Sequence, residues 1–260
     1  MWGLARATGR RVVLRIEDHD RQRSRPEFDA ALLEDLDWLG FVADTGPVRQ
    51  SDDSSAYDAA LAWLRDGGLV YVCDCTRSTF AAWTRAHGRP WSGDGCPGGC
   101  RVRELADGRG TGLRVTLGSG VETWDDLRLG PRRDDADRDG DVVVRDRHGN
   151  WTYPFCVVVD DARQRIDLVV RGEDLLDATA RQIRLGRLLG RNRPPVFYHH
   201  PLIRKPGGAK LSKSDGDTGV RELRARGVAP EMVLGEAAAA VGLLAEPRPL
   251  DLGSLDALFR

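Results

Sequence analysis

Four of the five cysteines have a spacing that could hold a metal ion. They form two pairs, Cys73 with Cys75 and Cys96 with Cys100, joined by a segment of twenty residues. Two close thiolate pairs in a cytoplasmic chain can close tetrahedrally around Zn²⁺ instead of forming disulfides. Four unliganded thiols are the alternative, because these spacings are not the commonest in zinc fingers. We predict one structural zinc site, with Cys156 as a buried strand residue outside it.

A lysine-containing loop is the second candidate for chemistry. The chain has 39 basic residues, but its only lysines are Lys205, Lys210 and Lys213, and two of these lie in the pentapeptide Lys210–Ser214. Ammonium groups in a loop next to glycines can offset the charge of a triphosphate. A chance cluster in a mobile loop is the alternative. Composition alone leaves both interpretations open.

Charged side chains also follow two predicted strands directly. The acidic cluster 17–20 follows the apolar run 12–16, and Arg171, Glu173 and Asp174 follow the run 166–170. Ligands often bind at the carboxyl ends of parallel strands in α/β sheets. We therefore expect these charges to line a binding edge.

Apolar runs, capping residues and glycine stops define the elements that would position these side chains. Helices are predicted at about 2–8, 26–40, 54–65, 178–189, 220–226 and 230–241, and strands at 12–16, 69–72, 142–144, 153–159, 166–170 and 197–198. Residues 73–125 interrupt this alternation and read as an inserted zinc module. The run 132–147, dense in Asp and Arg, is expected to be a solvated loop around one strand.

Composition limits the possible classes of protein. The chain has 260 residues, 30% of them charged and 41% hydrophobic, which excludes a disordered or membrane-spanning chain. The net charge of −1 excludes a polycation, so nucleic-acid contacts would need a local patch. No signal peptide is visible, and we expect a cytoplasmic protein.

Several motifs together resemble one enzyme family. Lys210–Ser214 is similar to the KMSKS signature of class I aminoacyl-tRNA synthetases, and Arg15–Asp20 resembles the RIEDTD strand end of glutamyl-tRNA synthetases. Tyr153, followed eighteen residues later by Arg171, resembles their glutamate-binding pair, and Tyr198–Leu202 also fits. The resemblance runs in the right order from the first helix to about residue 243.

The short part after the lysine loop and the cysteine module resemble the glutamyl-queuosine tRNA(Asp) synthetases within that family. These enzymes activate glutamate without tRNA and attach it to the queuosine base at the wobble position of tRNA(Asp). Their zinc ligands read Cys-x-Cys and then Tyr-x3-Cys. Cys96 stands here where the tyrosine would be. The resemblance therefore implies a site with four thiolates.

This resemblance implies an α/β fold: a class I synthetase Rossmann-like parallel sheet with an inserted zinc module and a short C-terminal helical part. The expected divisions are residues 1–72 and 131–205 for the catalytic domain, 73–130 for the zinc module, and 206–260 for the lysine loop and C-terminal helices. It also implies L-glutamate, ATP with Mg²⁺, and queuosine-containing tRNA(Asp) as partners, no membrane, and a monomer.

Residue roles follow from the same resemblance. Arg171 would bind the side-chain carboxylate of glutamate, Glu17 its ammonium group, and Tyr153 would line the pocket. Without the resemblance, the two charged residues read as surface ion pairs and the tyrosine as a core aromatic. Lys213 would be the catalytic residue that stabilises charge on the phosphates of ATP.

The remaining roles concern ATP and tRNA. Lys210 would help to bind the ATP phosphates, and Asp174 would reach the ATP ribose. One predicted helix has a row of three arginines, Arg181, Arg184 and Arg187, which would touch tRNA phosphates or form a solvated face. Two histidines, His199 and His200, are expected to be structural.

Two alternatives stay open. The chain could be a fragment of a glutamyl-tRNA synthetase that charges tRNA(Glu). It could also be an inactive nucleotide- or tRNA-binding paralogue, because family members begin with a strand and a His-x-Gly-His-like signature that precede the helix at which Met1 and Trp2 align. We expect the sequence as given to lack that segment and to leave an open strand edge beside Val12–Ile16.

Overall fold

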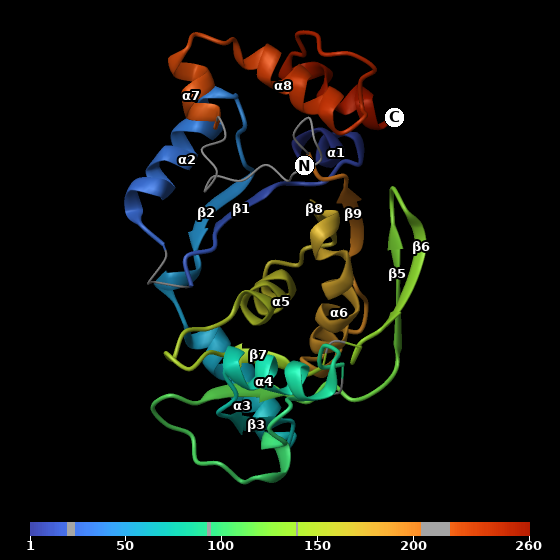
Figure 1. Cartoon of the computed structure of the whole chain (residues 1–260). Coiled ribbons are helices and arrows are strands. Elements are labelled where there is room, and N and C mark those ends of the chain that lie inside the picture. The colour runs from blue at the N-terminus through green and yellow to red at the C-terminus, as the bar shows by residue number, and fades with distance from the viewer. Residues whose placement is uncertain (20–23, 93–94, 139, 204–218) are drawn as a thin grey trace.

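The computed structural model describes residues 1–19, 24–92, 95–138, 140–203 and 219–260 (Figure 1). Its helices are α1 (Trp2–Ala7), α2 (Pro26–Trp38), α3 (Ser55–Asp66), α4 (Arg77–His87), α5 (Tyr153–Arg163), α6 (Thr179–Leu188), α7 (Val220–Ala225) and α8 (Pro230–Ala240). Its strands are β1 (Val13–Ile16), β2 (Thr45–Arg49), β3 (Val70–Cys73), β4 (Gly112–Val115), β5 (Val121–Asp126), β6 (Gly130–Asp135), β7 (Val142–Arg145), β8 (Leu168–Gly172) and β9 (Val196–His200).

The described strands form three sheets. β1 and β2 pair in parallel, and β3, β4 and β7 form an antiparallel sheet. The third sheet has the order β6-β5-β9-β8, in which β8 and β9 are parallel and β5 and β6 form an antiparallel hairpin. The charged residues expected to form a binding edge lie at the carboxyl ends of β1 and β8. These two strands belong to different sheets.

Helix α5 lies at the centre of the main core. Its apolar residues are buried all round, including Phe155, Cys156 and Val158, and they pack against α3, β4 and β7. Residues 153–159 were predicted to be a strand, and this prediction is wrong. A short run that is buried on every side has the same pattern in a strand and in a helix. Pro154 in the first turn, after the extended Thr152, starts a helix.

The hairpin of β5 and β6 corrects a second prediction. Residues 132–135 lie in the run predicted to be a loop, yet β6, which contains them, pairs along its whole length with β5. The side chains of β5 alternate between exposed and buried, but two of its three buried residues, Glu122 and Asp126, are acidic. Because hydrophobic alternation is the usual signal of a strand, this hairpin has almost no signature in the sequence.

The first and last segments of the described chain pack together. The final 3₁₀ segment, Leu252–Phe259, covers α1, and Gly3 lies so close that a Cβ atom there would be 2.7 Å from the Leu255 carbonyl oxygen. Trp2 stacks on Phe41 with ring centroids 4.5 Å apart. In Figure 1 both ends of the chain accordingly lie on the same side, next to α8.

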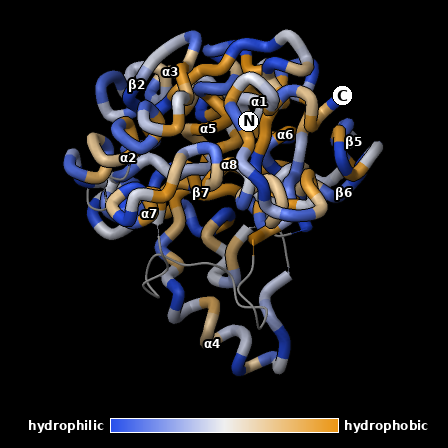
Figure 2. Tube along the Cα trace, turned by 90° about the horizontal axis from the view of Figure 1, so that it is seen from above, coloured by the Kyte–Doolittle hydropathy of each residue, from blue (hydrophilic) through white to orange (hydrophobic). Residues whose placement is uncertain are grey.

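Helix α4 and a cavity are two further features of the fold. Helix α4 projects away from the rest of the described chain in Figure 2, and it begins directly after the first cysteine pair. Between β1 and β8 lies a cavity of about 680 Å³, and in the described part of the chain each of these strands pairs with a single neighbour. The expected open edge beside Val12–Ile16 is therefore the wall of this cavity. None of the helices in the described ranges has the length and apolar character that crossing a bilayer requires.

Candidate active site and metal cluster

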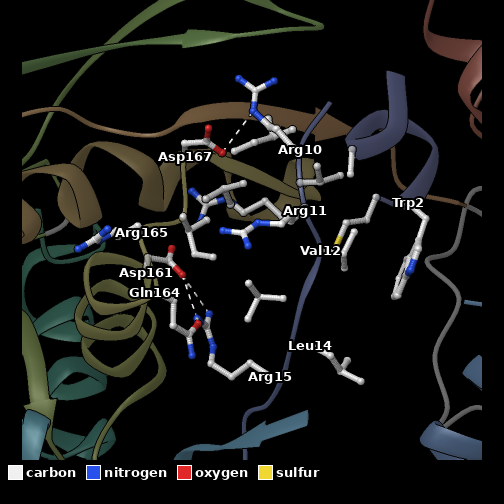
Figure 3. Close-up of a pocket in the computed structure, with 18 of the residues that line it drawn as sticks. Trp2, Arg10, Arg11, Val12, Leu14, Arg15, Asp161, Gln164, Arg165 and Asp167 are labelled. Carbon is white, nitrogen blue, oxygen red and sulfur yellow. Dashed lines mark hydrogen bonds and ion pairs between the residues drawn. The ribbon is translucent and has the colours of Figure 1, made fainter. Parts of the chain in front are cut away.

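The cavity between β1 and β8 brings together three of the predicted site residues. Glu17 follows β1, Tyr153 begins α5, and Arg171 lies near the end of β8; all three line the cavity. Figure 3 shows its two ends: Arg10 contacts Asp167 at one, and Arg15 contacts α5 at the other. Of the charged residues expected at the strand ends, Glu17 and Arg171 line the cavity, whereas Glu173 and Asp174 do not.

The guanidinium of Arg171 is held by neutral side chains. It donates from Nε to His199 Nε2 (3.0 Å), from Nη1 to Gln182 Oε1 (2.5 Å) and from Nη2 to Thr179 Oγ1 (2.7 Å). Its carbon lies 5.1 Å from the centre of the Phe197 ring. Arg171 is 8% exposed, and burial lowers its pKa. Among the described residues, no carboxylate is in ion-pair contact with it.

His199 connects Arg171 to a buried carboxylate. Its Nδ1 lies 2.5 Å from Asp126 Oδ2, and both side chains are completely buried. Burial lowers the pKa of His199 despite this hydrogen bond. Burial alone would raise the pKa of Asp126, but the hydrogen bonds from His199 and from the amides of Leu129 and Arg128 hold it below its usual value. The pair is therefore a neutral imidazole beside an ionised carboxylate.

Glu17 and Tyr153 are arranged differently. Glu17 is exposed and accepts hydrogen bonds from the Arg15 guanidinium at 3.1 and 3.3 Å. Burial raises the pKa of Tyr153, and the charge of Glu17 raises it further, so the phenol stays protonated. A protonated phenol and a carboxylate beside a buried cation suit a ligand that carries both an anionic and a cationic group.

Buried polar side chains fix the segment after β1. His19 Nδ1 lies 2.7 Å from Gln50 Oε1, and the amide of Gln50 donates to Asp160 Oδ2 at 2.8 Å. Tyr57 donates to the same carboxylate oxygen at 2.7 Å. These contacts tie the segment after β1 to α3 and α5, and neither motif nor spacing indicated them.

The predicted ATP residues are placed only in part. Asp174 is exposed in the 3₁₀ segment Glu173–Ala178 and does not line the cavity. Lys210 and Lys213 lie in 204–218, outside the described residues.

The arginine row on α6 is anchored to the hairpin. Arg184 and Arg187 both donate to the buried Glu122 of β5, at 2.5 and 2.7 Å. Their contacts explain why an acidic residue can be buried in β5. These two guanidinium groups stabilise the packing of α6 on the sheet, a role that the solvated-face interpretation did not include.

The four predicted metal ligands form one cluster. The sulfur atoms of Cys73, Cys75, Cys96 and Cys100 all lie within 4.8 Å of one another, with Cys75 and Cys100 3.6 Å apart. Tetrahedral ligation with Zn–S bonds of about 2.3 Å separates sulfurs by roughly 3.8 Å, so the cluster fits a metal ion. The Cys100 amide donates to Cys96 Sγ at 3.3 Å, which favours thiolate there.

Cys156 is remote from this cluster. It is fully buried in α5, and burial raises its pKa to about 12. It is thus a structural residue, as predicted, although in a helix.

Comparisons with known proteins place the chain in one family. The description "tRNA synthetases class I (E and Q), catalytic domain" matches residues 1–243. The chain is 41% identical to a glutamyl-Q tRNA(Asp) synthetase of Symbiobacterium thermophilum, over 96% of this chain and 82% of that protein. It is 39% identical to the glutamyl-Q tRNA(Asp) synthetase of Rhodobacter capsulatus, over 87% of each.

A solved structure supports the same fold. A glutamate tRNA ligase from Elizabethkingia meningosepticum, in complex with its amino acid, superposes with a TM-score of 0.78 at 23% identity, over 98% of this chain and 59% of that one. The chain belongs to the class I tRNA synthetases for glutamate and glutamine, and it is an ATP-dependent ligase of this type. Within that class it belongs with the glutamyl-Q tRNA(Asp) synthetases.

Proposed function

We propose that this protein activates L-glutamate with ATP, without tRNA, and transfers the glutamate to the queuosine base at the wobble position of tRNA(Asp). The observation that carries the proposal is the match over most of both lengths to two glutamyl-Q tRNA(Asp) synthetases. The cavity supports it, because a buried arginine without a carboxylate partner faces the place where an acidic substrate would bind.

Arg171 would recognise the side chain of glutamate. Guanidinium N–H groups donate to a carboxylate, whereas the amide of glutamine would turn N–H groups toward them. Tyr153 would donate to the substrate from its protonated phenol, and Glu17 would accept from the substrate's ammonium group. Each role matches the charge that the side chain carries in the cavity.

The reaction itself needs electrostatic help at the phosphates. The carboxylate of glutamate attacks the α-phosphorus of ATP, the bond to pyrophosphate breaks, and an aminoacyl-adenylate forms. We assign the stabilisation of this developing negative charge to Lys213, aided by Lys210 and a Mg²⁺ ion that arrives with ATP. Asp174, exposed after β8, would bind the ribose.

The four-cysteine cluster would hold one Zn²⁺ ion. Its ligands are all protein thiolates, so no position remains open for a substrate, and the ion would have a structural role. It would fix the segment 73–100, from which α4 projects.

The experiment is an exchange of pyrophosphate with ATP, followed by a transfer assay. We expect exchange with glutamate in the absence of tRNA, and then glutamate on queuosine-containing tRNA(Asp) but not on tRNA(Glu). Arg171→Ala should raise the KM for glutamate by about tenfold to 150-fold, because charge-assisted hydrogen bonds contribute about 1.5–3 kcal/mol. Charging of the 3′ end of tRNA(Glu) would support an ordinary glutamyl-tRNA synthetase, and no exchange at all would support an inactive paralogue.

A further inference from the structure

We propose that His199 and Asp126 are positioning residues that orient Arg171 and so allow the site to choose a carboxylate over an amide. This inference rests on the proposed function, since it concerns the same glutamate pocket. Neither residue lines the cavity; they act through Arg171.

The geometry leaves part of the guanidinium free for a substrate. Arginine has five N–H donors, and three of them are fixed by His199, Gln182 and Thr179. All three acceptors are neutral, so they hold the group in place without neutralising its charge. Tyr153 also interacts with the guanidinium, so the remaining N–H groups and the positive charge lie beside Tyr153 on the wall of the cavity, where a ligand carboxylate would bind.

Asp126 determines which nitrogen of His199 accepts. Because Nε2 accepts the Nε–H of Arg171, Nε2 has no proton, and the proton is on Nδ1, which donates to Asp126. Asp126 is fixed in turn by the backbone amides of Arg128 (3.0 Å), Leu129 (2.9 Å) and His199 (3.2 Å). A continuous chain of hydrogen bonds thus runs from the end of β5 to the arginine.

An intervening imidazole has a chemical advantage over direct contact. A carboxylate in contact with Arg171 would neutralise the guanidinium and weaken the preference for an anionic substrate. The imidazole lets the buried carboxylate orient Arg171 without touching it, and its Nε2 also contacts the Thr179 hydroxyl at 3.3 Å. Glutamate and glutamine have nearly the same shape, so this charge is the main difference that the pocket can read.

The test uses Asp126→Asn in pyrophosphate exchange without tRNA. Asparagine can donate to Nδ1, which moves the imidazole proton to Nε2, where it opposes the Nε–H of Arg171. We expect the KM for glutamate to rise by about tenfold or more, with the KM for ATP unchanged and kcat within about threefold. The preference for glutamate over glutamine should fall. Asp125→Asn, the same change on the exposed face of β5, is the matched control and should change nothing.

A second pair of variants keeps the test decisive if Asp126→Asn does not fold. His199→Ala should raise the KM for glutamate as Asp126→Asn does, and His199→Gln, whose carbonyl oxygen can accept from Arg171, should restore it to within about threefold of the wild type. The inference is overturned if folded His199→Ala binds glutamate normally, or if the KM values for ATP and glutamate rise together.

Failure of the proposed function would be seen separately. The exchange assay contains no tRNA, so a wild type that exchanges but never glutamylates tRNA(Asp) counts against the proposed acceptor alone. If the wild type shows no exchange, thermal stabilisation by glutamate, with glutamine as the comparison, supplies the same test on the same variants.

Discussion

Arg171 is a buried positive charge, and burying a charge without an anionic partner normally costs free energy of folding. Hydrogen bonds to three neutral side chains and the Phe197 ring offset part of that cost. The remaining cost would be recovered when an anion binds. Glutamate should therefore stabilise the protein against unfolding more than glutamine does.

Titration of His199 predicts a dependence of stability on pH. Its pKa is lowered from about 6.5 by burial, against the pull of Asp126 and together with the repulsion of Arg171 and Arg128. As pH falls below about 6.5, the unfolded chain takes up the proton and the folded chain does not, so stability is lost. Above that pH the contribution is fully present.

The measurement is urea denaturation between pH 8 and pH 5. The free energy of unfolding should fall toward pH 5 with a slope of at most about 1.4 kcal/mol per pH unit from this group. His199→Gln should remove that part of the slope. An identical slope in both proteins would mean that His199 titrates normally in the folded state.

Some residues of the cavity and its surroundings were predicted from the sequence and others were not, for a physical reason. Glu17, Tyr153 and Arg171 were predicted because they fall at strand ends or in motifs, and the four cysteines because of their spacing. The partners of Arg171 come from β5, α6 and β9, and only the tertiary structure brings them together. Asp126 is buried on the same face of β5 as Glu122 and Trp124, but in the sequence it resembles a surface acid.

At the level of elements, α5 was predicted to be a strand, whereas the other predicted helices and strands were of the right type. Most of the predicted helices and strands were found within a few residues, because caps, glycines and periodicity determine them locally. Residues 153–159 form a helix, and the sequence did not show this because a short run that is buried on every side has the same pattern in a strand and in a helix. Strand β2 is mostly exposed and is defined by its pairing with β1, so it was not predicted.

The four-cysteine cluster leads to a prediction about metal content and the segment 73–130. Purified protein should contain about one zinc per chain, and Cys100→Ala should lose the metal and loosen the segment 73–130. Elemental analysis and limited proteolysis measure the two effects. Cys156→Ala is the control, because it removes a buried cysteine remote from the cluster and should keep the zinc. Metal-free wild type with four freely alkylated thiols would contradict the site.

Substitution by alanine at two helical glycines should change the stability of the protein in opposite directions. A Cβ atom at Gly235 of α8 would overlap the carbonyl oxygen of Arg248, whereas at Gly186 of α6 its nearest contacts would be at 3.7 Å. Gly235→Ala should cost about 1–3 kcal/mol through overpacking. Gly186→Ala should gain about 0.5–1 kcal/mol of helix propensity. Urea denaturation measures both, and equal effects would mean that the segment around Arg248 moves freely away from α8.

At the scale of the whole molecule, β1 and β2 belong to one sheet, β8 and β9 to another, and the cavity lies between them. Polar side chains cross this boundary. Arg15 of β1 donates to Asp161 and Gln164 of the α5 region at 3.1 and 2.8 Å, and it also binds Glu17. Burial raises the pKa of Asp161, while Arg15 counteracts that rise. The charge of Arg15 therefore helps to join the two parts.

Removing Arg15 should weaken the contact between β1 and the α5 region and lower the free energy of unfolding. Arg15→Met leaves Asp161 buried without its partner, and we expect a loss of roughly 3–5 kcal/mol in the free energy of unfolding. Arg10→Met is the control. Its ion pair with Asp167 crosses the same boundary, but the Asp167 side chain is 72% exposed, so the loss should be below about 1 kcal/mol.

The double variant Arg15→Met with Asp161→Leu distinguishes the origin of that cost. If the loss in Arg15→Met comes from an unpaired buried carboxylate, replacing both partners with apolar side chains should restore most of the stability. If the loss comes from the missing link across the cavity, the double variant should remain as unstable as the single one. Urea denaturation at pH 7 separates these results, and a single variant no less stable than Arg10→Met would show that Arg15 does not join the two sheets.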